Sequence, residues 1–101
     1  MTRREILAEL GYDDTIVFEN PSYESALIGV TDDGRAVYEY HLMIEDLMKT
    51  EGWTFEESMD WVEVNALRGL PYFGGKAPIV MYKLDEFMLW FFNNKLINLY
   101  I

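Results

Sequence analysis

The sequence predicts a small α+β fold, and three features of the chain carry this prediction. The chain has 101 residues, half of them hydrophobic, which suits a single domain over 1–101 and is too short for two. Two runs rich in β-branched and aromatic residues flank a turn sequence within 25–40. Two segments with helical hydrophobic spacing then follow directly. Hairpin-linked strands followed by helices are typical of an antiparallel sheet packed by helices.

The chain begins with an expected helix and an expected strand. Thr2 and Glu5 have the spacing of a capping box, which predicts a helix near 2–10. The segment near 15–20 is rich in β-branched residues and stops at Pro21. We therefore expect a first strand there, joined to the antiparallel sheet.

The hairpin over 25–40 is the clearest local prediction. Asp33-Gly34 is a strong turn signal, because glycine tolerates a positive φ angle. The helix expected near 41–51 follows at once, since its apolar residues fall on one stripe and Gly52 suits its end.

A second helix is expected near 54–69. Thr54 and Glu57 form another capping box, and Gly69 with the proline after it would end the helix. Four residues at helical spacing should form its buried face: Phe55, Met59, Val62 and Ala66.

The C-terminal part of the chain is less patterned. Residues 77–83 predict a last strand, entered through the turn at Gly74-Gly75. The apolar, aromatic tail, 83–101, has poor amphipathicity, so helix and strand both fit it.

Negative charge is concentrated in the first two thirds of the chain. From Glu5 through Leu67 there are sixteen acids and two bases, Arg35 and Lys49, a balance of −14 against −10 for the whole chain. Binding to a nucleic-acid backbone needs lysine and arginine to neutralise phosphates, so we do not expect direct binding to nucleic acid. A basic partner, or solubility alone, explains the charge.

Two further features bear on the compartment. The chain has no cysteine, so no disulfide framework is expected. The N-terminus lacks the apolar core of a signal peptide, and the longest apolar run, 87–92, is far shorter than the ~18 residues of a membrane span. We expect a cytosolic, soluble protein.

No segment has a recognisable catalytic or cofactor signature, so we expect no enzyme, cofactor or metal. His41 is the single histidine, and it has no cysteine or serine motif to act with, so a structural place at a strand–helix junction is favoured. An EF-hand aligned on Gly34 would put Gly29 and Tyr40 at ligand positions that need carboxylates. The glycines of 72–78 lack the spacing of a phosphate loop.

Acids gather along one side of the helix near 54–69. With its first residue at 0°, Glu63, Glu56 and Asp60 lie at about 80°, 100° and 140°, beside the buried face. Glu56 suits the helix dipole in the first turn, whereas Asp60 and Glu63 lie beyond it. Trp61 and Val64 form a second apolar patch, which either another layer covers or a partner contacts.

The segments "IGVTDDGRAVYEY" (28–40) and "NALRGLPYFGGKAPIVMY" (65–82) resemble small uncharacterised proteins of phages and mobile elements of gut-type Firmicutes. The likeness covers about 2–82. In size and setting that group is similar to anti-defence proteins, including anti-CRISPR inhibitors. The resemblance implies a non-enzymatic inhibitor, and it assigns no functional residue.

Charge and resemblance together predict a small acidic, non-enzymatic binding protein. It would inhibit a nucleic-acid-handling effector, anti-CRISPR-like, by docking on its basic surface as a nucleic-acid mimic. The residues expected to contact that partner are Asp32, Asp33, Glu45, Asp46, Glu56, Asp60, Trp61 and Glu63. Two alternatives stay open: a structural or regulatory interaction module, dimeric through its aromatic tail, and a carboxylate-based hydrolase, which would need a cleft and a metal.

Overall fold

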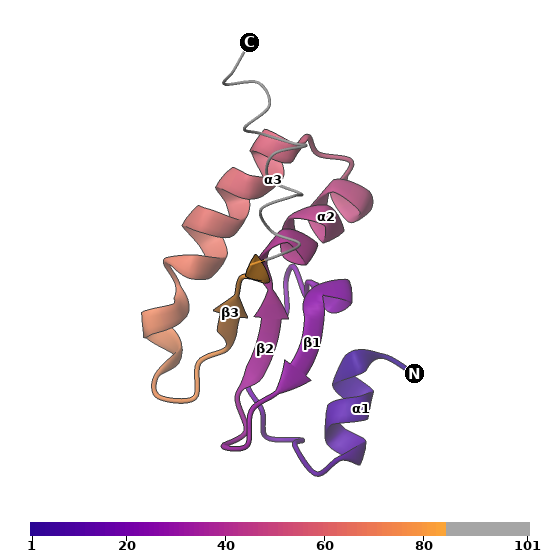
Figure 1. Ribbon diagram of the computed structural model, residues 1–101, viewed down its shortest axis with the longest axis vertical. Helices are drawn as coiled ribbons and strands as arrows, with labels where there is room; N and C mark the ends of the chain where they lie inside the picture. The colour runs from indigo at the N-terminus through magenta and orange to yellow at the C-terminus, as the bar shows by residue number, and fades with distance from the viewer. Residues whose placement is uncertain (85–101) are drawn as a thin grey trace.

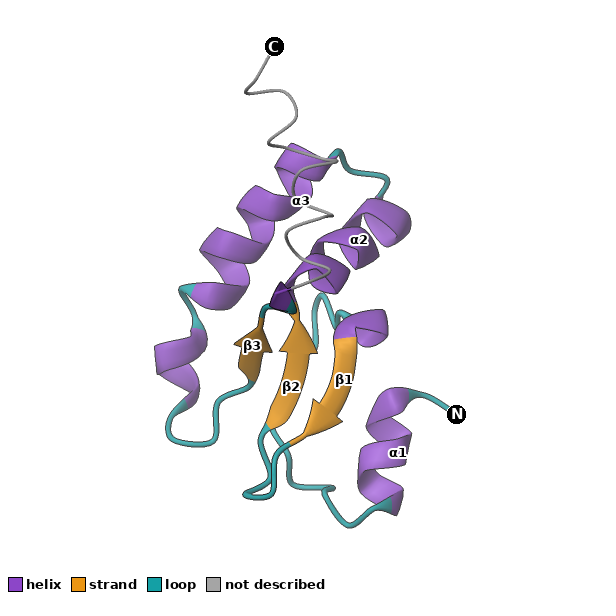
Figure 2. Ribbon diagram, in the orientation of Figure 1, coloured by secondary structure: helices purple, strands orange, loops and turns teal. Residues whose placement is uncertain are grey.

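The structure is a computed structural model and describes residues 1–84. The conformation of the tail, and the dimer contact expected there, fall outside the described residues. The elements, in chain order, are α1 (Arg3–Glu9), η1 (Glu24–Ala26), β1 (Leu27–Val30), β2 (Ala36–Glu39), α2 (Tyr40–Glu51), α3 (Phe55–Trp61), η2 (Val62–Leu67), η3 (Leu70–Phe73) and β3 (Ile79–Met81). The α+β prediction is confirmed (Figures 1 and 2).

The sheet is mixed, so the prediction of an antiparallel sheet is wrong in one pairing. The strand order is β1-β2-β3. β1 pairs with β2 in antiparallel fashion, as a hairpin must, whereas β3 runs parallel to β2. A parallel neighbour needs a long crossover. Here α2, α3, η2 and η3 all stand between β2 and β3 and supply that crossover.

The strand expected near 15–20 does not form. The backbone N–H of Phe18 donates to the side-chain hydroxyl of Tyr38 (3.1 Å) instead of to another strand. The hydroxyl of Thr15 donates to the carbonyl of Gly34 (3.1 Å). The segment is therefore fixed by side-chain hydrogen bonds. It buries the ring of Phe18 but does not pair with a strand of the sheet.

The hairpin turn is confirmed at the expected residues. The N–H of Thr31 donates to the carbonyl of Arg35 (2.8 Å), and the N–H of Gly34 donates to the carbonyl of Thr31 (3.0 Å). Gly34 has a φ of +87°, a conformation that side chains disfavour. The turn chemistry read from Asp33-Gly34 therefore sets the register of β1 against β2.

The three helices are confirmed with small changes at their ends. Both capping boxes form, at Thr2 in α1 and at Thr54 in α3. The N-cap of α2 is Glu39, whose Oε2 accepts from the N–H of Leu42 (2.9 Å). Gly52 ends α2 in the left-handed region at φ +71°. Along the described chain, no helix is both long and apolar enough to cross a bilayer.

The core lies between the sheet and the helices α2 and η2. The residues of the main core cluster come from α1, the 15–23 segment, η1, the hairpin, α2 and η2, and they are Leu7, Phe18, Tyr23, Ala26, Leu27, Ala36, Tyr38, Tyr40, Met43, Ile44, Leu47, Val62 and Ala66. The face expected on the helix near 54–69 is confirmed, since Val62 and Ala66 are fully buried. Phe55 and Met59 are half-buried against the core.

The hairpin turn and the loop between α2 and α3 lie at opposite ends of the molecule (Figure 1). α1 and the hairpin turn lie at one end of the sheet, and the loop from α2 to α3 lies at the other (Figure 1). From that loop, α3 and η2 run back along the β3 side of the sheet (Figure 2). This return places an exposed helical face beside the 15–23 segment.

Candidate functional site

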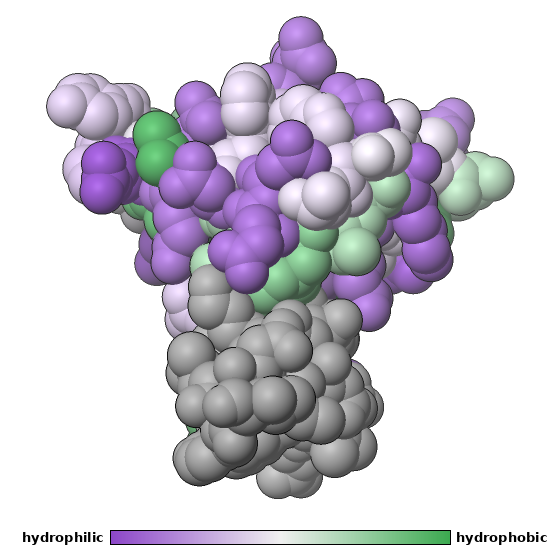
Figure 3. All heavy atoms as spheres, turned by 90° about the horizontal axis from the view of Figure 1, so that it is seen from above, coloured by the Kyte–Doolittle hydropathy of each residue, from purple (hydrophilic) through white to green (hydrophobic). Residues whose placement is uncertain are grey.

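The predicted acidic residues lie in three parts of the fold, the hairpin turn, α2, and α3 with η2, and not on a single surface. Asp32 and Asp33 lie in the turn before β2, whereas Glu56, Asp60 and Glu63 lie on α3 and η2, which start from the other end of the molecule (Figure 1). All five are exposed. Seen from above, hydrophilic side chains likewise stand on several sides of the described part (Figure 3).

Asp33 of the hairpin turn is engaged by the turn itself. The hydroxyl of Thr31 donates to Asp33 Oδ1, and Lys76 lies 3.9 Å from Asp33 Oδ2. The hydrogen bond from Thr31, followed by the charge of Lys76, lowers the pKa of Asp33. Lys76 also donates to the backbone carbonyl of Asp33. Asp33 thus closes the turn and links it to the segment before β3.

Asp46 of α2 is buried, which corrects the expectation that it faces a partner. Asp46 is 8% exposed, and its Oδ2 accepts from the N–H (3.1 Å) and the hydroxyl (2.6 Å) of Ser25. These bonds join α2 to η1. Glu39, another acid of the first two thirds of the chain, is fully buried as the cap of α2. Glu45 is half-buried.

His41 lies at the strand–helix junction, as expected, and is buried there. Its Nδ1 contacts Oε1 of Glu39, the cap residue two positions before it. Both side chains are almost inaccessible to solvent. The pair is therefore part of the start of α2 and is not open to a ligand from the described surface.

Two acids on α3 and η2, Asp60 and Glu63, differ from Asp33 in having no ion pair within the described residues. Within residues 1–84 no ion pair joins Asp60 or Glu63 to a lysine or an arginine. Glu63 accepts a hydrogen bond from the buried hydroxyl of Tyr40. Burial first, and the charge of Glu63 second, raise the pKa of Tyr40 and of its ring neighbour Tyr82. Glu63 is thereby held at the surface with its charge unneutralised.

A π-helical segment follows Trp61 directly. In η2 the N–H of Arg68 donates to the carbonyl of Glu63 (3.3 Å), which is the i→i+5 pattern of a π-helix. π-helical segments are rare in proteins, and those that occur often lie at functional sites. Hydrophobic periodicity at 3.6 residues per turn gives no signal for this widening, so the sequence analysis missed it.

Trp61 is partly exposed and is held in place on both sides. Its ring lies 5.2 Å from the ring of Trp53, and its indole donates a hydrogen bond to the hydroxyl of Tyr23. Burial, then the charge of Asp46, raise the pKa of Tyr23 to about 12. Of the two interpretations of the patch, exposure is the one observed, since Trp61 is 38% and Val64 43% exposed.

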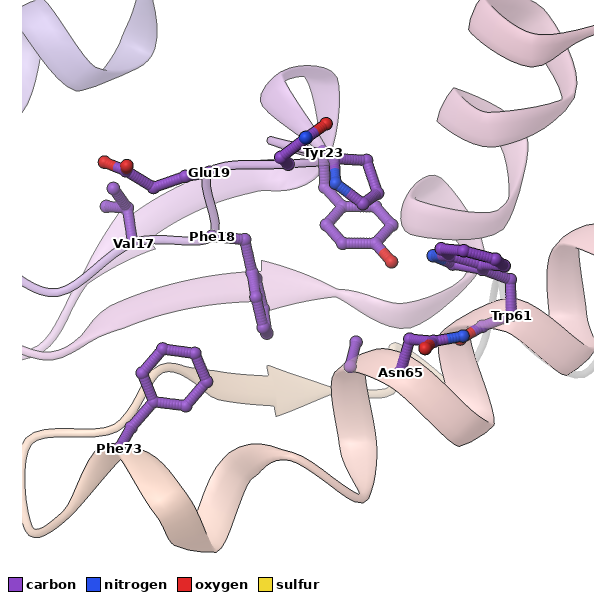
Figure 4. A pocket seen from close by; sticks show the side chains of 10 residues that line it. Val17, Phe18, Glu19, Tyr23, Trp61, Asn65 and Phe73 are labelled. Atoms are coloured by element: carbon purple, nitrogen blue, oxygen red, sulfur yellow. The ribbon is translucent and has the colours of Figure 1, made fainter.

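A hollow of about 350 Å³ opens beside Trp61. Figure 4 shows the rings of Phe18 and Phe73 on one side of it, and Tyr23 with Trp61 on the other. Phe18 and Phe73 meet at 5.8 Å with nearly perpendicular rings. The sequence analysis missed this hollow because its walls come from three separate segments, 17–23, 61–66 and residue 73.

The glycine-rich segment 72–78 is a turn tied to the hairpin. Residues 72–78 make a turn in which the N–H of Ala77 donates to the carbonyl of Gly74 (3.2 Å), and their lysine is engaged by the hairpin. Within residues 1–84 no group of three or more His, Cys, Asp or Glu side chains is placed to hold a metal ion.

Comparison of the chain with protein-family models, with curated proteins and with solved structures found no match. The candidate site is therefore defined by geometry alone. It consists of the acid row on α3 and η2 (Glu56, Asp60 and Glu63), the partly exposed Trp61, and the adjoining aromatic hollow.

Proposed function

We propose that this chain is a small, acidic, non-enzymatic binding protein. It docks through the exposed face of α3 and η2 on a basic, nucleic-acid-binding surface of a partner protein, and it inhibits that partner by occupying the surface. The observation that carries this proposal is the acid row, in which Asp60 and Glu63 have no cation of the described chain beside them.

The repulsion within the acid row supports a role in binding a partner. Acids at helical spacing repel each other by roughly 0.2–0.5 kcal/mol per pair. Asp60 is exposed, lies outside the first turn and takes part in no cap, so the helix gains nothing from its charge. A positive partner surface would convert this repulsion into attraction.

Trp61 adds an exposed apolar anchor on a neighbouring side of α3, about 100° around the helix from Asp60. Tryptophan is enriched among the residues that dominate binding energy, and a rigid side chain loses little entropy on binding. The contacts with Trp53 and Tyr23 already fix the indole before any partner arrives. An anchor beside a charged row is the usual composition of an interface centre and its rim.

A binding assay with two matched charge reversals tests the proposal. Asp60→Lys and Asp13→Lys change the net charge equally at two exposed acids, one inside the site and one in the loop after α1. With immobilised polylysine as the basic probe, Asp60→Lys should weaken binding by roughly three- to tenfold more than Asp13→Lys. Equal losses would show that net charge alone governs binding, and the proposal would fail.

Salt is the second variable of the assay. The Debye length falls from about 10 Å at 0.1 M salt to about 3 Å at 1 M. Binding by an exposed acid row should therefore weaken steeply over that range of salt concentration. Affinity that does not change with salt would contradict an electrostatic dock.

Inhibition needs its own measurement. RNA-guided nucleases hold nucleic acid in positively charged channels, which makes them suitable test partners for an anti-CRISPR-like inhibitor. The purified protein should reduce DNA cleavage by such an effector, and Asp60→Lys should relieve the inhibition more than Asp13→Lys. Unchanged cleavage across a panel of effectors would count against this class of partner.

A further inference from the structure

We propose that the hollow beside Trp61 receives the guanidinium group of an arginine side chain on the partner. This inference deepens the proposed function, on which it rests, because it names the partner residue that the aromatic end of the site selects. Trp61 and Asn65, which line the hollow, lie on a different side of α3 and η2 from the acid row, so the hollow would be a second contact region for the same partner.

The walls of the hollow suit a flat cation. Four aromatic residues line it: Phe18, Tyr23, Trp61 and Phe73. A guanidinium is planar, weakly hydrated and stacks on aromatic rings, whereas the ammonium of lysine is compact and strongly hydrated. Phe73 is 37% exposed, so its ring is reachable from solvent. Cations over aromatic rings are attracted by the ring quadrupole.

The polar atoms of the hollow match a group that only donates. Asn65 donates through Nδ2 to the carbonyl of Trp61 (3.2 Å), which leaves its Oδ1 as the amide atom that can accept. A guanidinium has five N–H donors and no acceptor. Figure 4 shows the amide of Asn65 beside the indole, at the edge of the hollow.

Charge also favours a cation over an anion. Among the described residues that line the hollow, Glu19 is the only charged one. Its carboxylate already accepts from the guanidinium of Arg4 (2.8 Å), and both side chains are at least half exposed, so this rim pair can exchange readily. Among residues 1–84, no lysine or arginine lines the hollow to hold a phosphate. The chain as a whole carries a charge of −10.

The size of the hollow limits the ligand to one side chain. Its volume of about 350 Å³ is at the small end of the range for ligand pockets, which is roughly 300–1,000 Å³. Ala66 contributes little bulk to the lining, and the ring of Phe18 is fixed by contacts with Tyr23 (5.4 Å) and Tyr38 (4.8 Å). A preformed site of this kind loses little entropy when it binds.

The test uses the full-length protein and three small probes. N-acetyl-arginine amide, N-acetyl-lysine amide and N-acetyl-citrulline amide are titrated into ¹⁵N-labelled protein, and the signals of the Trp61 indole and the Asn65 side-chain amide are followed by NMR. Citrulline keeps the shape of arginine but is uncharged. We expect saturable shifts with arginine, and at least tenfold weaker binding of the other two. Equal binding of citrulline, or arginine shifts elsewhere only, would overturn the proposal.

Two variants with a matched control locate the site. Phe73→Ala removes a wall and Asn65→Leu removes the acceptor, while Tyr72→Ala changes a neighbouring ring that is 91% exposed and does not line the hollow. Both site variants should weaken arginine binding at least fivefold, and Tyr72→Ala should leave it unchanged. Asn65 is exposed, so its variant carries the test if Phe73→Ala fails to fold.

The outcomes separate this inference from the proposed function. If Asp60→Lys and Asp13→Lys weaken polylysine binding equally while arginine still binds at Trp61, the acid-row dock fails and the arginine site stands. If Phe73→Ala and Tyr72→Ala bind the arginine probe equally while Asp60→Lys alone weakens polylysine binding, the arginine site fails and the dock stands.

Discussion

Asp33 and Asp60 are both exposed aspartates of one acidic chain, yet their surroundings differ. Asp33 accepts from Thr31, pairs with Lys76 and closes the turn between β1 and β2. Asp60 takes part in no ion pair or cap of the described chain. The comparison teaches that an acid count cannot locate a binding surface until the acids that the fold itself uses are subtracted.

The buried acids extend the comparison. Glu39 caps α2 and contacts His41, while Asp46 joins α2 to η1 through Ser25. Both carboxylates accept hydrogen bonds from polar groups that would otherwise be unpaired inside the molecule. Acids with a partner in the fold should therefore govern stability, and acids of the exposed row should govern binding. The following variants test that division, from the largest expected effect on stability to the smallest.

Glu39→Ala should produce the largest loss of stability. Removing this side chain takes away the cap of α2, at a cost of about 0.5–2 kcal/mol, and leaves the buried His41 without its carboxylate neighbour, at a cost of about 1–3 kcal/mol. The free energy of unfolding, measured by urea titration, gives the value. Glu45→Ala, on the same helix but half-buried, is the control and should cost far less. Similar losses for both would mean that burial does not separate the two kinds of acid.

Asp46→Ala should rank second. The change leaves the hydroxyl and N–H of Ser25 without their acceptor, at a cost of about 1–3 kcal/mol. The double variant with Ser25→Ala should lose less than the sum of the two single losses, since they share one interaction. Strict additivity in the urea titrations would contradict this contact.

Asp33 should show its role in a pH titration. Its pKa lies below the ordinary value of 3.8, chiefly through the hydrogen bond from Thr31. A lowered pKa favours the folded state above pH 3.8, and this contribution is lost as the pH falls through the lowered pKa. Side-chain carboxyl shifts measured by NMR should place the Asp33 midpoint below 3.8, and Thr31→Val should move it upward. An unchanged midpoint in the variant would assign the shift to another cause.

Asp60→Lys should have the smallest effect on stability, within about 0.5 kcal/mol, as expected for an exposed residue outside caps and pairs. Glu63→Lys should cost more, because it also removes the acceptor of the Tyr40 hydroxyl. If Asp60→Lys proved as damaging as Asp46→Ala, the exposed row would have a structural role and its place in the proposed interface would be undermined.

Local chemistry explains what the sequence could predict. The capping boxes at Thr2 and Thr54 and the turn at Gly34 each depend on residues within four positions of one another, and all three are confirmed. The direction of β3 depends on how four intervening elements pack, which no short pattern contains. The prediction of a strand near 15–20 was wrong because side-chain hydrogen bonds hold this segment in place of backbone pairing with the sheet.

The site was predictable only in part, for the same reason. The spacing of Glu56, Asp60 and Glu63 placed them on an exposed face of one helix, and that holds. Spacing could not show that Asp46 meets Ser25, which lies across the fold. The hollow could not be foreseen either, because its walls meet only when distant segments converge.

The parallel pairing of β3 has a consequence for the order of folding. β1 and β2 are joined by a five-residue turn, 31–35, so their contacts close a short loop, whereas Val37 meets Ile79 only after the whole helical stretch has been ordered. Closing the longer loop costs more entropy and slows the search. A refolding chain should therefore build the hairpin early and complete the Trp61 face late, so a partner would meet that face only on a finished molecule.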